Sequence, residues 1–269
     1  MMGRQVEMLA SGCLEGRRFA VTGAGTGIGR AIALRLAALG ATVGGMGRRE
    51  GPLQETLSMT SQGRFVPLPC DIRDYEAAAR VMTTFAEGGL NGLVNNAGGQ
   101  FYAEASDISV NGFSAVVDLN LTALFALTNA MRPYLAQSGG AIVNMSIVGA
   151  ERGALGLAHA VAARSGASGL SKALALEWGA DRIRVNSIAV GTVETESFRA
   201  ATTEQLRRDL AGQSPIARLV EAAEVAELTA FLLSDAAGMI TGQTLRLDGG
   251  AFLAAPVDMR PAKQDVMHE

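Results

Sequence analysis

Residues 22–29 read Thr-Gly-Ala-Gly-Thr-Gly-Ile-Gly and stand between a short apolar run and an amphipathic segment. Glycines at this spacing let a chain turn sharply after a strand and bring its backbone close to a bound group. The helix that follows presents free amide groups at its N-terminus, where an anion binds favourably. The stretch therefore predicts a strand–turn–helix unit that holds the pyrophosphate of a dinucleotide. Its predicted contacts are Gly23, Thr26, Gly27, Ile28 and Gly29.

The end of the second predicted strand favours NADP(H) over NAD. In an NAD-binding protein this position normally carries a carboxylate, which accepts hydrogen bonds from the adenosine ribose. Here residues 45–49 read Gly-Met-Gly-Arg-Arg, which provides two guanidinium groups and no acid. Arg48 and Arg49 would hold a ribose 2′-phosphate through charge-assisted hydrogen bonds. The alternative is that the two arginines only form a solvated pair at the start of a helix.

Short apolar runs alternate with longer amphipathic segments along the whole chain, which is typical of a parallel sheet covered by helices on both faces. The predicted strands are residues 18–22, 42–46, 64–67, 92–95, 141–145, 184–188 and 244–247. The predicted helices begin near Gly27, Pro52, Asp74, Val110, Ala158, Thr203 and Ala222. We expect one α/β domain at residues 14–253, with an N-terminal extension at 1–13 and a C-terminal tail at 254–269.

The composition excludes several classes of protein. The 269 residues include 23 Lys and Arg and 26 Asp and Glu, a net charge of −3, without a block of like charge. This balance gives no indication of a nucleic-acid-binding surface. Cys13 and Cys70 lie far apart without a disulfide or metal-ligand spacing, so we expect a reducing cytoplasm and no metal. Charged residues interrupt the apolar stretches and the start lacks a secretory signal pattern, so no membrane association is expected.

The glycine motif at residues 22–29 also resembles the TGxxxGxG motif of the short-chain dehydrogenase/reductases, and further matches follow in order from about Leu14 to Leu253. Residues 95–98 resemble the family's Asn-Asn-Ala-Gly turn after the fourth strand, and residues 240–250 resemble its C-terminal pattern. The resemblance implies a Rossmann-type, doubly wound parallel sheet of seven strands in a three-layer arrangement. It further implies cofactor contacts at Asp71, Ile72, Asn96, Ala97, Gly98, Gly191, Val193 and Thr195, although Val190 replaces a proline of the family pattern.

The catalytic positions of that family are changed in this chain. Counted from Asn144, the family's Ser falls at Ile147, its Tyr at Ala160 and its Lys at Arg164. The register is fixed on the other side by residues 165–178, which match the family without a gap. Only the active-site Asn is retained, as Asn120, and that residue can instead brace a helix kink.

These replacements disfavour an ordinary carbonyl reductase. When a hydride reduces a carbonyl group, the alkoxide needs a proton, which Tyr supplies while Ser donates a hydrogen bond to the same oxygen. Ala160 and Ile147 can do neither. Arg164 can bind the nicotinamide ribose hydroxyls and supply a fixed positive charge, but it does not donate a proton near neutral pH.

Residues 95–101 and 159–166 resemble the peroxisomal trans-2-enoyl-CoA reductases and, less closely, the 2,4-dienoyl-CoA reductases, which also depart from the Tyr motif and use NADPH. Hydride addition to the β-carbon of an unsaturated thioester places charge on an enolate oxygen, for which hydrogen-bond donors matter more than a phenol. The resemblance therefore implies an NADPH-dependent enoyl-thioester reductase whose substrate is carried by CoA or acyl carrier protein. Gly149 stands where the dienoyl enzymes carry a Tyr, which disfavours the dienoyl activity.

Other candidate residues have structural alternatives. Ser146, a catalytic candidate, precedes the usual Ser position and would face the opposite side of an extended strand. His159 lies about 100° from Ala160 around a helix, and is either a structural or interface residue or a proton donor. Gln100 and Phe101 either line an acyl pocket or close a loop.

Two other functions stay open at this point. The chain could be a catalytically silent NADP(H)-binding protein with a structural or sensor role, or an atypical carbonyl reductase with His159 as its proton donor. Residues 193–210 stand where the family has its substrate lid. The resemblance also implies a homo-oligomer, a tetramer built through helices at residues 111–135 and 158–178.

Overall fold

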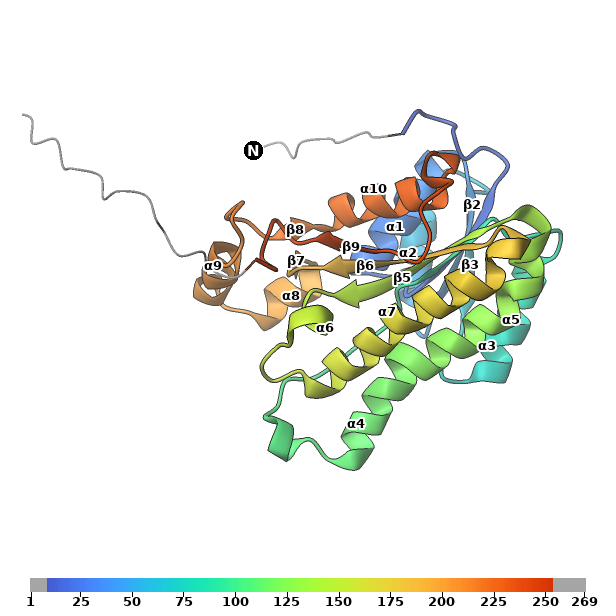
Figure 1. The fold of residues 1–269 in the computed structure, drawn as a ribbon. Helices are drawn as coiled ribbons and strands as arrows, with labels where there is room; N and C mark the ends of the chain where they lie inside the picture. The colour runs from blue at the N-terminus through green and yellow to red at the C-terminus, as the bar shows by residue number, and fades with distance from the viewer. Residues whose placement is uncertain (1–8, 254–269) are drawn as a thin grey trace, which may run out of the picture.

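The computed structural model describes residues 9–253, which form three layers with a parallel sheet in the middle (Figure 1). The sheet has seven strands in the order β3-β2-β1-β4-β5-β6-β9. Because both faces are covered by helices, the inner strands are nearly continuous runs of buried residues. Their bounds are β1 (Arg18–Thr22), β2 (Thr42–Gly47), β3 (Phe65–Pro69), β4 (Gly92–Asn95), β5 (Ala141–Ile147), β6 (Arg184–Val190) and β9 (Thr244–Leu247).

Each face of the sheet packs against its own helical layer. On one face α1 (Gly27–Ala38), α2 (Glu50–Ser58) and α10 (Ala222–Leu233) bury apolar side chains that recur every three or four residues, such as Ile32 and Leu36. On the other face α3 (Tyr75–Ala86), α5 (Ala123–Ser138) and α7 (Ala158–Trp178) do the same. Burial of these stripes holds the three layers together.

The winding direction of the sheet changes between β1 and β4. Strand β1 pairs with β2 on one side and with β4 on the other, and all three are parallel. The chain segments that leave the carboxyl ends of β1 and β4 therefore run to opposite faces of the sheet. Ligands of open α/β sheets bind in the crevice that opens at this point.

The predicted seven-stranded doubly wound fold is confirmed. Its elements begin close to the predicted positions, although β3 covers Phe65–Pro69 rather than 64–67, and β5 and β6 run on to Ile147 and Val190. The structure adds elements that were not predicted: α6 (Gly149–Arg152), α8 (Glu196–Ala201) and a small second sheet of β7 (Val193–Glu194) and β8 (Val220–Glu221). These elements are too short to produce a recognisable hydrophobic period.

The helix predicted at Val110 is longer than expected, because α4 (Val110–Val117), the π-helical turn η2 (Asp118–Thr122) and α5 follow one another without a break. By length and composition alone, this stretch of 29 residues could cross a membrane, and 28% of its most apolar window is buried. In the fold it belongs to a helical layer, where α5 packs against α3 and α4 packs against α7. The predicted extension is described only from residue 9, and the predicted tail at 254–269 lies outside the described residues.

Candidate active site

The glycine turn after β1 has the shape that a pyrophosphate site requires. Gly23 and Gly27 adopt φ of 71° and 53°, a region that favours glycine. A Cβ at Gly29 would overlap the Gly23 carbonyl and lie 2.5 Å from Asn96 Nδ2. Thr26, the exposed residue before α1, makes no side-chain cap, and the first turn of α1 contains no acid. The helix start, which includes Ile28, is therefore open to an anionic ligand.

The turn after β4 is tied to the end of β1. Asn96 Nδ2 donates to the Thr22 carbonyl at 2.9 Å, and the amides of Asn96 and Ala97 both donate to Thr22 Oγ1 at 3.0 Å. These bonds fix the two predicted cofactor segments relative to each other. Gly98, the next residue, is exposed.

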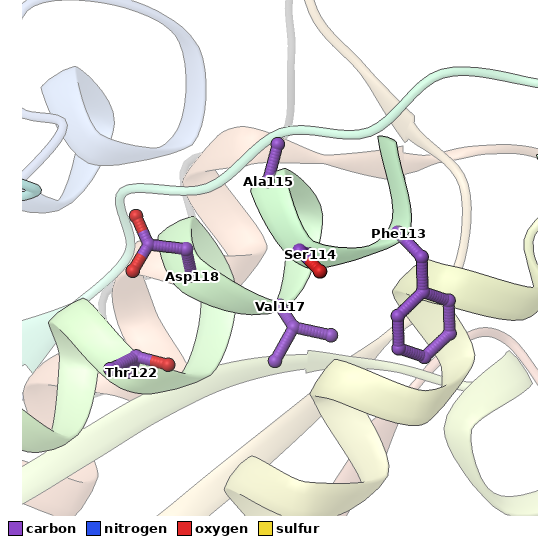
Figure 2. A pocket seen from close by; sticks show the side chains of 6 residues that line it. All are labelled: Phe113, Ser114, Ala115, Val117, Asp118 and Thr122. Carbon is purple, nitrogen blue, oxygen red and sulfur yellow. The ribbon is translucent and has the colours of Figure 1, made fainter. Parts of the chain in front are cut away.

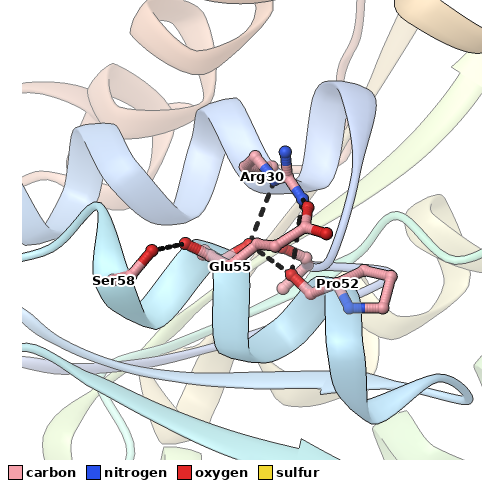
Figure 3. Close-up of polar contacts among 6 residues, drawn as sticks. Arg30, Pro52, Glu55 and Ser58 are labelled. Carbon is pink, nitrogen blue, oxygen red and sulfur yellow. Dashed lines mark hydrogen bonds and ion pairs between the residues drawn. The ribbon is translucent and has the colours of Figure 1, made fainter.

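Helix α2 is held against α1 behind the glycine turn (Figure 3). Arg30 Nη2 donates to Glu55 Oε2 at 2.6 Å and to the Pro52 carbonyl at 3.4 Å. Thr56 Oγ1 donates to the Ala24 carbonyl at 3.1 Å. These contacts position the start of α2, and with it the arginine pair that precedes the helix.

That pair, Arg48 and Arg49, is exposed after the end of β2, and within residues 9–253 neither guanidinium forms a hydrogen bond or an ion pair. On the neighbouring strand end, Asp71 is different, because Arg73 Nη2 pairs with its carboxylate at 2.6 Å. The hydrogen bond from Arg73, with a contribution from the charge of Arg48, lowers the pKa of Asp71. Ile72 is buried beside it. Both arginines of the pair are thus available to a 2′-phosphate.

The predicted lid segment lies over the glycine turn. Thr195 starts α8, where its hydroxyl accepts a hydrogen bond from the Phe198 amide at 3.2 Å, and its methyl group would lie 3.4 Å from a Cβ at Gly27. Val193 is joined to Val220 through the small β7–β8 sheet. Gly191 donates its amide to the Leu247 carbonyl at 3.0 Å. The structure therefore brings Thr195 and Gly27 together, two predicted cofactor contacts that are far apart in the sequence.

Asn120 lies buried in the π-helical turn η2. A π turn shifts the helical hydrogen bonds by one residue and leaves a carbonyl without its usual partner. Asn120 Nδ2 satisfies the carbonyl of Val116 at 2.7 Å and also donates to the Gly99 carbonyl at 2.8 Å, while its Oδ1 accepts from the Gly99 amide at 3.3 Å. Asn120 thus braces a helix irregularity and at the same time fixes the loop after β4.

Arg164 is a buried charged residue next to the same loop after β4. Its Nη1 donates to the Met145 carbonyl at 2.6 Å, and no carboxylate pairs with it among the described residues. Burial lowers the pKa of Arg164 to about 10, so the side chain stays charged at neutral pH. A Cβ at Gly98 would overlap this guanidinium and lie 2.6 Å from Asn120 Oδ1. Arg164 and Asn120 therefore meet at Gly98.

The positions of the family's Tyr and Ser carry no hydroxyl group here. Ala160 is 2% exposed on α7, and Ile147 is half-buried at the end of β5. Ser146 is turned toward α7, where its hydroxyl donates to the Arg164 carbonyl at 3.4 Å and accepts from Ser168 Oγ at 3.2 Å. These contacts favour a packing role for Ser146.

His159 is fully buried at the first turn of α7. Its Nδ1 accepts a hydrogen bond from the Ala160 amide at 2.8 Å, and its ring meets that of Phe101 edge-on at a centroid distance of 4.3 Å. Phe101 and Gln100 are exposed on the loop that Asn120 holds. The structure thus places His159 beside this loop, although the sequence pattern alone also allowed an interface position.

Sequence inspection missed a buried polar network behind the site. Asn95 Nδ2 donates to Thr128 Oγ1 and to Asn144 Oδ1, both at 2.8 Å, and Asn144 Nδ2 donates to Ser171 Oγ at 2.8 Å. The network connects β4 and β5 to α5 and α7. Its signal in the sequence is an Asn in each of two predominantly apolar strands, because a buried amide needs hydrogen-bond partners.

A separate pocket of about 500 Å³ lies on α4 and the π turn (Figure 2). Its lining residues are Phe113, Ser114, Ala115, Val117, Asp118 and Thr122. Neither Asn120 nor Arg164 lines it. The candidate active site is therefore the region around Gly98, where Asn120 and Arg164 meet, and not this pocket.

Comparisons with known proteins agree with the architecture. Residues 23–251 match a family model described as "Enoyl-(Acyl carrier protein) reductase". The chain is 38% identical to a tropinone reductase homolog of Arabidopsis thaliana, covering 88% of this chain and 91% of the homolog. It is 34% identical to a probable 2,4-dienoyl-CoA reductase of Bacillus subtilis, covering 89% and 98%. A crystal structure of a putative short-chain alcohol dehydrogenase from Sinorhizobium meliloti superimposes with a TM-score of 0.83 at 36% identity, covering 88% and 97%. The chain therefore belongs to the short-chain dehydrogenase/reductase family of oxidoreductases.

Proposed function

We propose that this protein reduces the C=C bond of an α,β-unsaturated acyl thioester with NADPH. The observation that carries the proposal is the combination of a dinucleotide turn of suitable shape with a buried, unpaired Arg164 at Gly98. The neighbouring positions Ala160 and Ile147 provide no acidic hydroxyl group. Such a site can stabilise negative charge on an oxygen but lacks the side chain that usually protonates an alkoxide.

Conjugate reduction requires stabilisation of an enolate oxygen but no acidic hydroxyl group in the protein. NADPH would provide a hydride to the β-carbon, and the electron pair of the C=C bond moves onto the thioester carbonyl to form an enolate. The positive charge of Arg164 stabilises charge that develops nearby, since a buried charge is weakly screened. Asn120 holds the Gly99 backbone in place. Water then protonates the α-carbon, which completes the saturated thioester.

Relatives of this chain support an acyl-thioester substrate. Besides the Bacillus subtilis protein, a peroxisomal 2,4-dienoyl-CoA reductase of Arabidopsis thaliana is 33% identical, and an acetoacetyl-CoA reductase of Shinella zoogloeoides is 35% identical. Two of the three names specify reduction of a C=C bond. The dienoyl activity itself is less well supported, because a Cβ at Gly149 would lie 2.9 Å from the Ala154 Cβ and leaves little room for the Tyr of those enzymes.

The unpaired arginines after β2 support NADPH as the cofactor. Each charge-assisted hydrogen bond to a 2′-phosphate contributes about 1.5–3 kcal/mol. Replacing Arg48 and Arg49 by Ala should therefore raise KM for NADPH by on the order of 10–100-fold and leave KM for NADH within a few-fold. Equal effects on both cofactors would show that the pair does not recognise the 2′-phosphate.

The activity is tested by incubating the full chain with NADPH and trans-2-enoyl-CoAs of increasing chain length, and by following absorbance at about 340 nm. A 2,4-dienoyl-CoA and acetoacetyl-CoA serve as competing substrates. We expect saturated acyl-CoA to form and the ketone to react far more slowly. Faster reduction of acetoacetyl-CoA would favour a carbonyl reductase, and NADPH binding without turnover of any substrate would favour a silent nucleotide-binding protein.

A further inference from the structure

The Nε2 atom of His159 is fully buried and has no hydrogen-bond partner, one of three such side-chain atoms found within residues 9–253. The other two are the Nε atoms of Arg18 and Arg35, whose Nη2 atoms do have partners. An unsatisfied buried donor or acceptor costs about 1–3 kcal/mol. A group of this kind at the edge of a candidate active site suggests a ligand that completes its hydrogen bonding.

The contacts of the other ring nitrogen determine the chemical character of Nε2. His159 lies in the first turn of α7, where backbone amides have no helical acceptor. One of these amides, that of Ala160, donates to Nδ1 at 2.8 Å. An imidazole nitrogen that accepts a hydrogen bond carries no proton, so the proton of the neutral ring lies on Nε2. Nε2 is therefore a fixed donor without an acceptor.

Two contacts place His159 beside the loop that follows β4. The edge-on contact with Phe101 connects His159 to the loop that begins at Gly98 and Gly99. Further along that loop, the Ala103 amide donates to the Gly156 carbonyl at 3.2 Å and joins the loop to the segment before α7. The Phe101 ring, 41% exposed, offers an apolar wall next to the donor. A ligand with an apolar group and a polarised oxygen, such as an acyl thioester, fits the Nε2 donor of His159 and the Phe101 ring together.

We propose that His159 Nε2 donates a hydrogen bond to the thioester carbonyl oxygen of the substrate and that Phe101 packs against the acyl chain. This role rests on the proposed enoyl-thioester reduction and assigns its directional donor. As the hydride reaches the β-carbon, the carbonyl oxygen gains negative charge and the bond from Nε2 strengthens. Arg164 contributes charge to the site, whereas His159 contributes a donor whose position the helix start fixes.

The test compares His159→Phe, which removes both ring nitrogens, with His159→Gln, whose side-chain amide can replace the Nε2 donor. Loss of one donor to a developing oxyanion lowers kcat by about 10²–10³-fold. We expect a loss of that size in His159→Phe, with unchanged NADPH affinity, and recovery to within about tenfold in His159→Gln. Ser168→Ala, elsewhere on α7, is the matched control and should leave kcat unchanged.

A spectroscopic measurement separates this role from a structural one. The absorption of cinnamoyl-CoA shifts to the red when its carbonyl is polarised by a hydrogen bond. We expect the shift on binding to the wild-type protein, a smaller shift with His159→Phe, and the full shift with Ser168→Ala. No shift with the wild-type protein, or equal shifts in all three, would overturn the inference. Absence of turnover with any enoyl-CoA would instead count against the proposed reaction, because the shift requires binding only.

Discussion

Replacing Arg164 by Met should stabilise the protein while reducing its activity. The charged side chain is buried without a carboxylate partner within residues 9–253, and burial lowers its pKa from the ordinary value to about 10. At about 1.4 kcal/mol per pKa unit, the buried charge costs about 3 kcal/mol at neutral pH. Removing the charge therefore stabilises the protein by that amount. The substitution also removes the hydrogen bond to the Met145 carbonyl, which reduces the stabilisation by about 1 kcal/mol. The expected net effect is a free energy of unfolding higher by about 2 kcal/mol.

The pH dependence of this difference follows from the same pKa. Arg164 is a base whose pKa is lower in the folded protein than in the unfolded chain, so its cost is fully present below about pH 10. The cost falls only as the pH rises from that value toward the pKa of the unfolded chain. The difference between the wild-type and Arg164→Met proteins should therefore be constant between about pH 6 and 9.

Urea unfolding at several pH values measures this difference directly, and a thermal midpoint higher by roughly 4–8 °C should accompany it. Enoyl-CoA reduction by Arg164→Met should fall by on the order of 100-fold. Arg164→Lys is the matched control, because it retains a charge and should not gain stability. If Arg164→Met unfolds at a lower urea concentration than the wild-type protein, the side chain is a net stabilising group and the reasoning fails.

Gly98→Ala should abolish turnover, because its Cβ would overlap the neighbouring guanidinium, and the protein should remain folded by circular dichroism; normal turnover would mean that the loop can move aside. Glu227→Ala should lower the free energy of unfolding by about 2 kcal/mol, between the effects for exposed and fully buried pairs, since it leaves the half-buried Arg35 without its ion-pair partner; a urea titration that finds less than about 1 kcal/mol would contradict this. Arg73 lowers the pKa of Asp71, so the stabilisation by Asp71 is present above the ordinary carboxyl pKa and is lost as the pH falls through the lowered one. Asp71→Asn should therefore cost up to about 1 kcal/mol at neutral pH and less in acid, below the ordinary carboxyl pKa, as measured by urea unfolding at both pH values.

The seven-stranded fold and the glycine turn could both be predicted from the amino-acid sequence, because both depend on local patterns. Apolar runs that alternate with amphipathic segments require a sheet buried between helices. Glycines between a strand and a helix require a tight turn with free amides, and the structure has that turn at Gly23 and Gly27. The count from Asn144 also predicts that Ala160 and Arg164 replace the family's Tyr and Lys, and the structure places both residues on α7.

The contacts among Arg164, Asn120 and His159 could not be predicted from the sequence and became visible in the folded protein. Arg164 and Asn120 come from different elements and meet at Gly98 because the π turn η2 packs against α7. No local pattern could show that Arg164 lacks a carboxylate partner or that His159 retains an unsatisfied donor. Periodicity reports which face of a helix is apolar, whereas the partners of a buried polar group are set by elements far apart in the chain.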